Sequence, residues 1–127
     1  MSVRTELRDA VRLILDDRYE VPDEPAVPPA SSASRRWVVT VEQANVKPGP
    51  SQGTLTHELH LMLVVLTQDA ELVETELEDA LEYLLEQLLR SSFDHGFVSA
   101  DRDVVNNLHA YDLTLTIASD VTDTTKE

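Results

Sequence analysis

The sequence contains no cysteine and only three glycines in 127 residues. The lack of cysteine excludes disulfide bridges, thiolate metal sites and a cysteine nucleophile. Gly49, Gly53 and Gly96 are too few and too scattered for a phosphate-binding loop or a dinucleotide-binding motif. The longest unbroken apolar run, residues 61–66, is too short to cross a bilayer as a helix. We therefore expect no redox chemistry based on thiols and no membrane-spanning segment.

Basic residues are also scarce, since 10 Lys and Arg stand against 24 Asp and Glu and give a formal net charge of −14. Binding to duplex DNA needs clustered Lys and Arg to meet the phosphates, so specific DNA binding is not expected. An anionic membrane surface would repel such a chain as well. The hydrophobic fraction of 42% is enough to build a core. The sequence therefore predicts one acidic globular domain covering residues 1–127.

Two stretches have apolar residues at helical spacing. The first predicts an amphipathic helix over about residues 3–18, and the second predicts one over about residues 73–88, capped by Thr67 or Asp69. Between the first helix and the first strand, residues 22–34 are rich in Pro and Ser. Such a composition is typical of an extended or poorly ordered connector.

Alternating apolar and polar residues predict strands over about residues 37–42, 55–67 and 111–118, with a short edge strand around Val98 and Val104. Together with the two helices, these strands predict an α+β fold, in which a small, mostly antiparallel sheet packs against both helices.

Three further segments complete the organisation. Residues 45–53 contain two prolines and two glycines, and they predict an extended loop. Residues 59–66 are apolar on both strand faces, so we expect a helix to cover one face and a partner subunit to be able to cover the other. The polar tail, residues 122–127, is expected to fray.

The charge pattern of the second helix is uneven, because no Lys or Arg occurs between Pro48 and Leu89. Like charges four residues apart each cost roughly 0.2–0.5 kcal/mol on an isolated helix. The acidic side is either a solvated surface or a surface that meets a basic partner or repels passing polyanions. Its members opposite the leucine stripe are Glu71, Glu78, Glu82 and Glu86.

A basic edge accompanies the first helix, where Arg4, Arg8 and Arg12 recur every four residues. Two interpretations are open. The arginines pair locally with neighbouring aspartates, or they face the acidic helix of another subunit, since the guanidinium group binds a carboxylate through two hydrogen bonds.

No constellation typical of an enzyme is present. His57 and His60 lie three apart on a predicted strand and so point to opposite faces, and no histidine has a recognisable zinc-site spacing. The cluster over residues 91–96 contains two serines and a histidine, but it lacks the strand–turn–helix signature of a serine nucleophile. We expect no catalytic residues, no metal and no cofactor.

The order of elements resembles the tail terminator, or tail-completion, proteins of long-tailed bacteriophages that infect actinobacteria. The resemblance covers nearly the whole chain and is one of pattern. It is carried by residues 7–11, the Pro-rich run, residues 38–42, the loop over 45–53, residues 61–67 before an acidic helix, and residues 110–117.

This resemblance implies a structural role in the virion. Such proteins form a ring, usually a hexamer, on the head-proximal end of the tail tube. The ring ends tube polymerisation and offers the surface that joins the head. The implied partners are further copies of the chain, the tail tube protein and a head-completion or stopper protein. DNA passes through the ring without specific binding. The implied location is the head–tail junction, after assembly in the host cytoplasm.

Two sets of residues are candidates for this role. The polar positions of the predicted strands on the side opposite the core are candidates for the lumen of the ring: Glu42, Glu58, His60, Asp112, Thr114 and Thr116. The candidates for contacts with a subunit or the tube come from the basic edge, the loop and the acidic helix: Arg4, Arg8, Arg12, Asn45, Val46, Lys47, Pro48, Gln52, Glu71, Glu78, Glu82 and Glu86.

Other functions are compatible with the same sequence. Another head–tail connector, such as a stopper or adaptor ring, has a similar size. An acidic inhibitor that mimics DNA would account for the charge, although the basic edge fits it poorly. A small-molecule enzyme is a third alternative.

Overall fold

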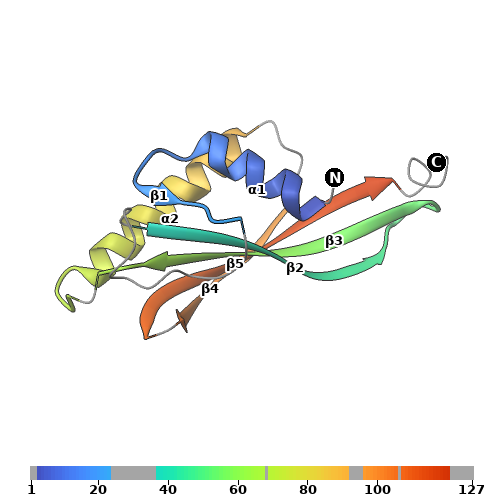
Figure 1. The fold of residues 1–127 in the computed structure, drawn as a ribbon. Helices are drawn as coiled ribbons and strands as arrows, with labels where there is room; N and C mark the ends of the chain where they lie inside the picture. The colour runs from blue at the N-terminus through green and yellow to red at the C-terminus, as the bar shows by residue number, and fades with distance from the viewer. Residues whose placement is uncertain (1–2, 24–36, 68, 92–95, 106, 121–127) are drawn as a thin grey trace.

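In the part of the chain that the structure describes, two helices and one five-stranded sheet form an α+β fold (Figure 1). The computed structural model describes residues 3–23, 37–67, 69–91, 96–105 and 107–120. Most of the predicted connector and the whole of the predicted frayed tail lie outside these residues. The elements in chain order are α1 (Val3–Ile14), β1 (Tyr19–Glu20), β2 (Trp37–Pro48), β3 (Thr54–Val65), α2 (Val73–Arg90), β4 (Gly96–Val105) and β5 (Leu108–Asp120).

The sheet is mixed and has the strand order β1-β2-β3-β5-β4. β1 runs parallel to β2, whereas the β2–β3, β3–β5 and β4–β5 pairs are antiparallel. Both helices lie on the same face of the sheet (Figure 1). We call this the helix face and the opposite side the open face.

The main core lies between the helices and the helix face. Alternate residues of β2 before its bulge (Trp37, Val39 and Val41) and of β3 (Leu59, Leu61, Leu63 and Val65) point toward the helices. The apolar stripes of α1 and α2 pack against them. The phenol of Tyr19 connects two layers, because it donates a buried hydrogen bond of 2.7 Å to the carbonyl of Ala80. Fully buried members of this core include Leu7, Val11, Trp37, Val39, Leu61, Leu77, Leu84, Leu113 and Leu115.

A second, smaller cluster lies on the open face at the end of the sheet near β1. It contains Val38, Val64, Leu108 and Ala110, and Val105 is among the residues that pack against it. Val38 and Val64 are fully buried in the single chain. A partner subunit, which the apolar sequence of β3 allowed, is therefore not needed to cover this part of the open face.

The first helix ends earlier than its periodicity predicts, at Ile14 and not near Arg18. The carboxylate of Asp16 accepts a hydrogen bond of 2.9 Å from the backbone N–H of Arg18. Such a local hydrogen bond competes with the continuation of the helix. A second acidic residue, Asp17, adds negative charge at the C-terminal end of the helix, where the helix dipole disfavours it. The chain then enters β1, a two-residue strand too short for any periodicity to reveal.

The predicted loop over residues 45–53 is wrong for its first four residues, which belong to β2. Val46 pairs with His57 and Lys47 pairs with Thr56, after a bulge between Gln43 and Asn45. Pro48 is tolerated because it ends a strand at the sheet edge, where no ladder partner needs its missing N–H.

Residues 49–53 form the turn that joins β2 to β3. Gly49 donates to the carbonyl of Thr54 at 2.8 Å, and Gly53 has a φ of 85°. A Cβ at position 49 would come within 2.1 Å of the Thr54 hydroxyl, so glycine is required there. The turn is therefore tight, and the segment is a hairpin.

The remaining boundaries also differ from the sequence prediction. The N-cap of α2 is Leu72, which makes no side-chain capping bond. Asp69 instead accepts from the N–H of Glu71, and Thr67 accepts from the N–H of Asp69. These two side chains stabilise the turn before the helix and do not cap it. β4 is a ten-residue edge strand, longer than predicted, because it pairs along most of β5.

Candidate functional site

The six candidate lumen residues share one face of the sheet, the open face. His60 of β3 lies between Glu42 of β2 and Thr114 of β5, which are its direct cross-strand partners. Glu58 pairs with Thr116 in the same way. Asp112 lies diagonally beside His60, opposite Met62. Because side chains alternate along a strand, these registers place all six on the side away from the helices.

The imidazole of His60 is held between two carboxylates. Its Nδ1 lies 2.8 Å from Oδ1 of Asp112, and its Nε2 lies 3.4 Å from Oε2 of Glu58. Burial opposes protonation, but the hydrogen bonds to Asp112 and Glu58 outweigh it and raise the pKa of His60 above its ordinary value. The protonated ring can donate to both carboxylates at once.

Two further carboxylates extend this acidic surface, and the sequence reasoning missed them. Asp101 of β4 lies directly opposite Asp112, and Asp103 lies opposite Ala110. Both therefore join the open face. Their alternation in Asp101-Arg102-Asp103 could have revealed this if the strand had been predicted at its full length. Around His60, the open face thus carries carboxylates from four strands: Glu42, Glu58, Asp101, Asp103 and Asp112.

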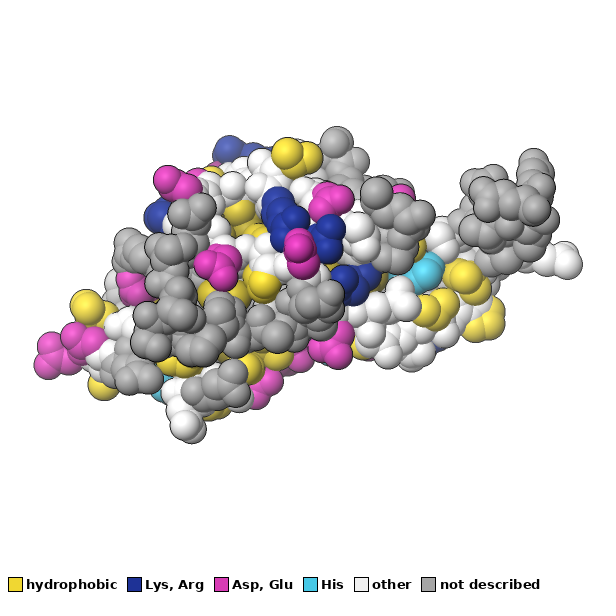
Figure 2. Space-filling view, in the orientation of Figure 1, with side chains coloured by type: hydrophobic (Ala, Val, Ile, Leu, Met, Phe, Trp, Pro, Cys, Tyr) yellow, Lys and Arg dark blue, Asp and Glu magenta, His cyan; other side chains and the backbone are white. Residues whose placement is uncertain are grey.

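A projecting hairpin carries the candidate contacts between residues 45 and 52. β2, β3 and β5 continue past the N-terminal end of α1 and form what we call the arm (Figure 1). Asn45, Val46, Lys47, Pro48 and Gln52 are all exposed there. Hydrophobic side chains gather at this end of the space-filling view (Figure 2). The arm therefore offers a mixed apolar and polar surface to a partner.

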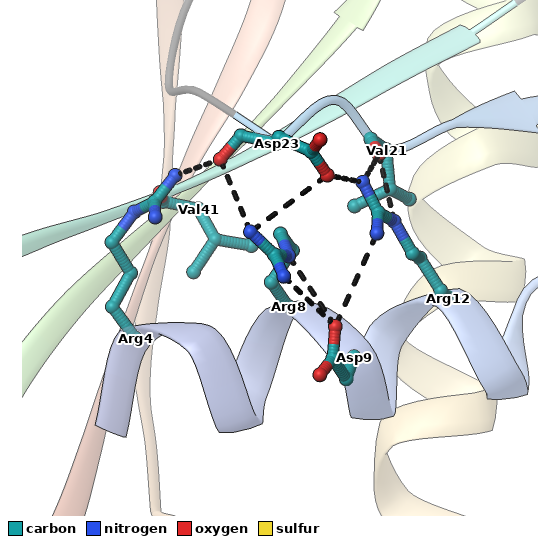
Figure 3. A network of polar contacts seen from close by, with 7 residues as sticks. All are labelled: Arg4, Arg8, Asp9, Arg12, Val21, Asp23 and Val41. Carbon is teal, nitrogen blue, oxygen red and sulfur yellow. Dashed lines mark hydrogen bonds and ion pairs between the residues drawn. The ribbon is translucent and has the colours of Figure 1, made fainter. Parts of the chain in front are cut away.

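The candidate arginines of α1 bind the segment that follows β1 (Figure 3). Arg12 donates to the carbonyl of Val21 at 2.7 and 2.9 Å and to the carboxylate of Asp23. Arg8 forms an ion pair of 3.2 Å with Asp9. The hydrogen bond from Arg12 holds the pKa of the exposed Asp23 carboxyl below its usual range.

Arg4 reaches further along the fold than the other two. Its Nε donates to the carbonyl of Val41, 37 residues away, at 2.7 Å, and Nη2 donates to the carbonyl of Asp23. It thereby ties α1 to the outer edge of β2. The sequence could not show these partners because both are main-chain carbonyls. A contact between this basic edge and another subunit would have to compete with bonds inside the chain.

The exposed side of α2 is strongly acidic. Among its carboxylates, Glu86 pairs with Arg90 at 2.8 Å, and Glu74 binds both terminal nitrogens of Arg102. The hydrogen bond from Arg102 lowers the pKa of Glu74. Within the described ranges Glu78 and Glu82 have no ion-pair partner. Glu71 precedes the helix and is exposed.

The described residues contain no group of His, Cys, Asp and Glu arranged to hold a metal ion. His57 and His60 point to opposite faces, as the sequence predicts. His57 is buried between Gln43, at 3.0 Å, and Ser119, at 2.7 Å. In the part of the chain that the structure describes, no helix is long and apolar enough to span a membrane.

No known protein family and no curated protein matches this sequence.

Proposed function

We propose that this chain is a structural phage protein that forms a ring on the head-proximal end of a tail tube, ends tube growth and presents the surface that joins the head. Residues 1–127 would form one tail-terminator-like domain. In this proposal the sheet is mostly antiparallel and both helices are amphipathic. The elements follow one another along the chain as in the tail terminator proteins that the sequence resembles.

The acidic open face carries this proposal. A channel for DNA needs a wall that does not retain the phosphates. A negatively charged surface repels the phosphates and so meets this need. Glu42, Glu58 and Asp112 lie on three adjacent strands of one face, and Asp101 adds a fourth strand. A ring with this face turned inward would have a bore lined with carboxylates and Thr hydroxyls.

The arm supports the same assignment. It projects beyond the helices and exposes Val46 and Pro48 beside Lys47. Exposed apolar side chains on a rigid projection are typical of a surface that meets another protein. In the proposed ring, the arm contacts the tail tube or the next subunit. Further partners are the head-completion or stopper protein and the DNA that passes through the bore.

The acidic charge also fits an inhibitor that mimics DNA, and the size fits a stopper or adaptor ring. Partner choice separates the three functions. A terminator binds the tail tube protein, a stopper binds on the portal side, and a mimic binds a nucleic-acid enzyme in competition with DNA.

Negative-stain imaging of the purified protein with assembled tail tubes, together with its mass by light scattering, tests the proposal. Rings seated on one end of each tube are the expected result. A monomer that leaves tubes unchanged and binds a nuclease in competition with DNA would refute it in favour of the mimic.

A further inference from the structure

A small apolar cavity lies between the C-terminal end of α2 and the beginning of β4. Its volume is about 90 Å³, and it is lined by Leu85, Leu88, Leu89 and Phe97. Leu89 is 78% exposed, Phe97 is 44% exposed, and the neighbouring Val98 is 60% exposed. A cavity of this size, surrounded by exposed apolar side chains, can accommodate one aliphatic side chain of another protein.

The cavity lies beside a free strand edge. β4 is the last strand of the sheet, so no strand among the described residues neighbours the backbone groups on its outer side. An extended peptide can add to such an edge, where main-chain hydrogen bonds give affinity and pockets select alternate side chains. The bulge between Phe97 and Ser99 changes the register with β5 next to the cavity.

Unpaired carboxylates lie along the same side of α2. Glu78 and Glu82 precede Leu85 and Leu89 by seven residues each, which places them two turns away on the same sides of the helix. Within the described ranges neither glutamate has an ion-pair partner, whereas Arg90 and Arg102 already bind Glu86 and Glu74. A ligand that fills the cavity therefore meets negative charge further along the helix.

We propose that the groove between α2 and the edge of β4 binds an extended segment of a partner protein, which places an aliphatic side chain in the cavity and a Lys or Arg against Glu78 and Glu82. Two helical turns span about 10 Å. A strand advances about 3.3 Å per residue and returns to the same face every second residue. The basic residue therefore lies two or four positions from the aliphatic one. This docking mode is independent of the proposed ring.

The test uses a fluorescein-labelled peptide, Thr-Lys-Thr-Lys-Thr-Leu-Thr-Lys-Thr-Lys-Thr, whose Leu and Lys side chains share one face of a strand. Fluorescence anisotropy measures its affinity for the full chain at physiological salt. We expect saturable binding, with amide NMR shifts concentrated over Gly96–Val105. A version N-methylated at alternate threonines has fewer backbone donors and should bind at least about tenfold more weakly.

Matched variants separate this groove from general attraction to an acidic protein. Leu89→Ser with Phe97→Ser removes the cavity lining without changing the charge, and should weaken binding at least about tenfold. Leu13→Ser alters a leucine that is 87% exposed on α1, and should leave binding unchanged. Glu78→Gln with Glu82→Gln should weaken binding more than Glu6→Gln with Asp17→Asn.

Circular dichroism checks that each variant is folded. Absence of saturable binding would overturn the proposal, as would equal effects of the two charge-neutralising pairs. NMR shifts confined to the open face or the arm would overturn it as well.

Discussion

His60 of β3 and Asp112 of β5 are joined by a 2.8 Å contact across the open face, from the imidazole Nδ1 to Oδ1. Glu58 approaches the other ring nitrogen, and Glu42 is the cross-strand partner of His60 on β2. One histidine thus neutralises part of the most acidic region of the sheet, and its charge depends on pH near neutrality.

The His60 contacts predict a specific pH dependence of stability. The folded-state pKa of His60 lies above the ordinary value of 6.5, so the protonated ring stabilises the fold fully below that value. The stabilisation is lost as the pH rises through the folded-state pKa. Urea unfolding at about pH 6 and at about pH 8.5 measures this loss. Between the two pH values, the unfolding free energy of His60→Gln should decrease less than that of the wild type.

Asp112→Asn provides the control for this effect, because it removes the charged partner and leaves the histidine. It should also reduce the pH dependence. Parallel profiles for the wild type and His60→Gln would show that the contacts do not favour the protonated ring.

The buried phenol of Tyr19 predicts a cost for Tyr19→Phe. Burial raises the pKa of Tyr19, so its hydroxyl stays protonated and donates to the carbonyl of Ala80. Loss of this hydrogen bond should lower the unfolding free energy by about 1 kcal/mol in urea titrations. Tyr83→Phe keeps the ring that stacks on Tyr19 and should cost less. Equal costs would contradict a special role for the Tyr19 hydroxyl.

The sequence allowed prediction of the longer elements because their periodicity extends over several turns or pleats. Residues 55–67 and 73–88 were placed close to β3 and α2, and the alternation of polar residues correctly put Glu42, His60 and Asp112 on one face. β1 was missed because two residues carry no periodicity. Residues 45–48 have the composition of a turn, but their pairing with β3 outweighs this local propensity, and the residue types alone do not show that pairing.

The contacts of the α1 arginines could not be predicted for a different reason. Arg4 and Arg12 bind the main-chain carbonyls of Val41 and Val21. Every residue has such a carbonyl, so the residue type does not show which one accepts the bond. Asp101 and Asp103 were missed from the open face because the extent of an edge strand depends on its neighbour, β5.

Arg4→Met should destabilise the chain by about 1–2 kcal/mol, because the carbonyl of Val41 loses a charged donor in a partly buried position. Arg4→Lys should recover part of this loss. Arg12→Met, whose bonds to the Val21 carbonyl and to Asp23 are exposed, should cost less than Arg4→Met. Thermal unfolding measures the stability of all three variants. Wild-type stability of Arg4→Met would contradict a stabilising hydrogen bond from Arg4 to the Val41 carbonyl. Reversal of Arg4, Arg8 and Arg12 to Glu should therefore weaken the monomer itself.

The arm can be shortened without breaking the register of the sheet. Lys47 and Thr56 are direct partners in a hydrogen-bonded pair, so replacing residues 48–55 by Asn-Gly joins them through a two-residue turn. The shortened chain should keep its circular dichroism spectrum and its cooperative unfolding. In the proposed ring it should fail to cap tubes, as judged by negative-stain imaging. Normal capping by a folded, shortened chain would exclude the arm from the contact with the tube.

The central claim is that this chain ends tail-tube growth. It is tested most directly by polymerising the tail tube protein, adding the wild-type chain during growth, and measuring tube lengths by electron microscopy over time. The proposal predicts that lengths stop increasing once one end of each tube carries a ring, and that the shortened-arm variant allows growth to continue. Unchanged growth at saturating concentrations of wild-type chain would contradict it.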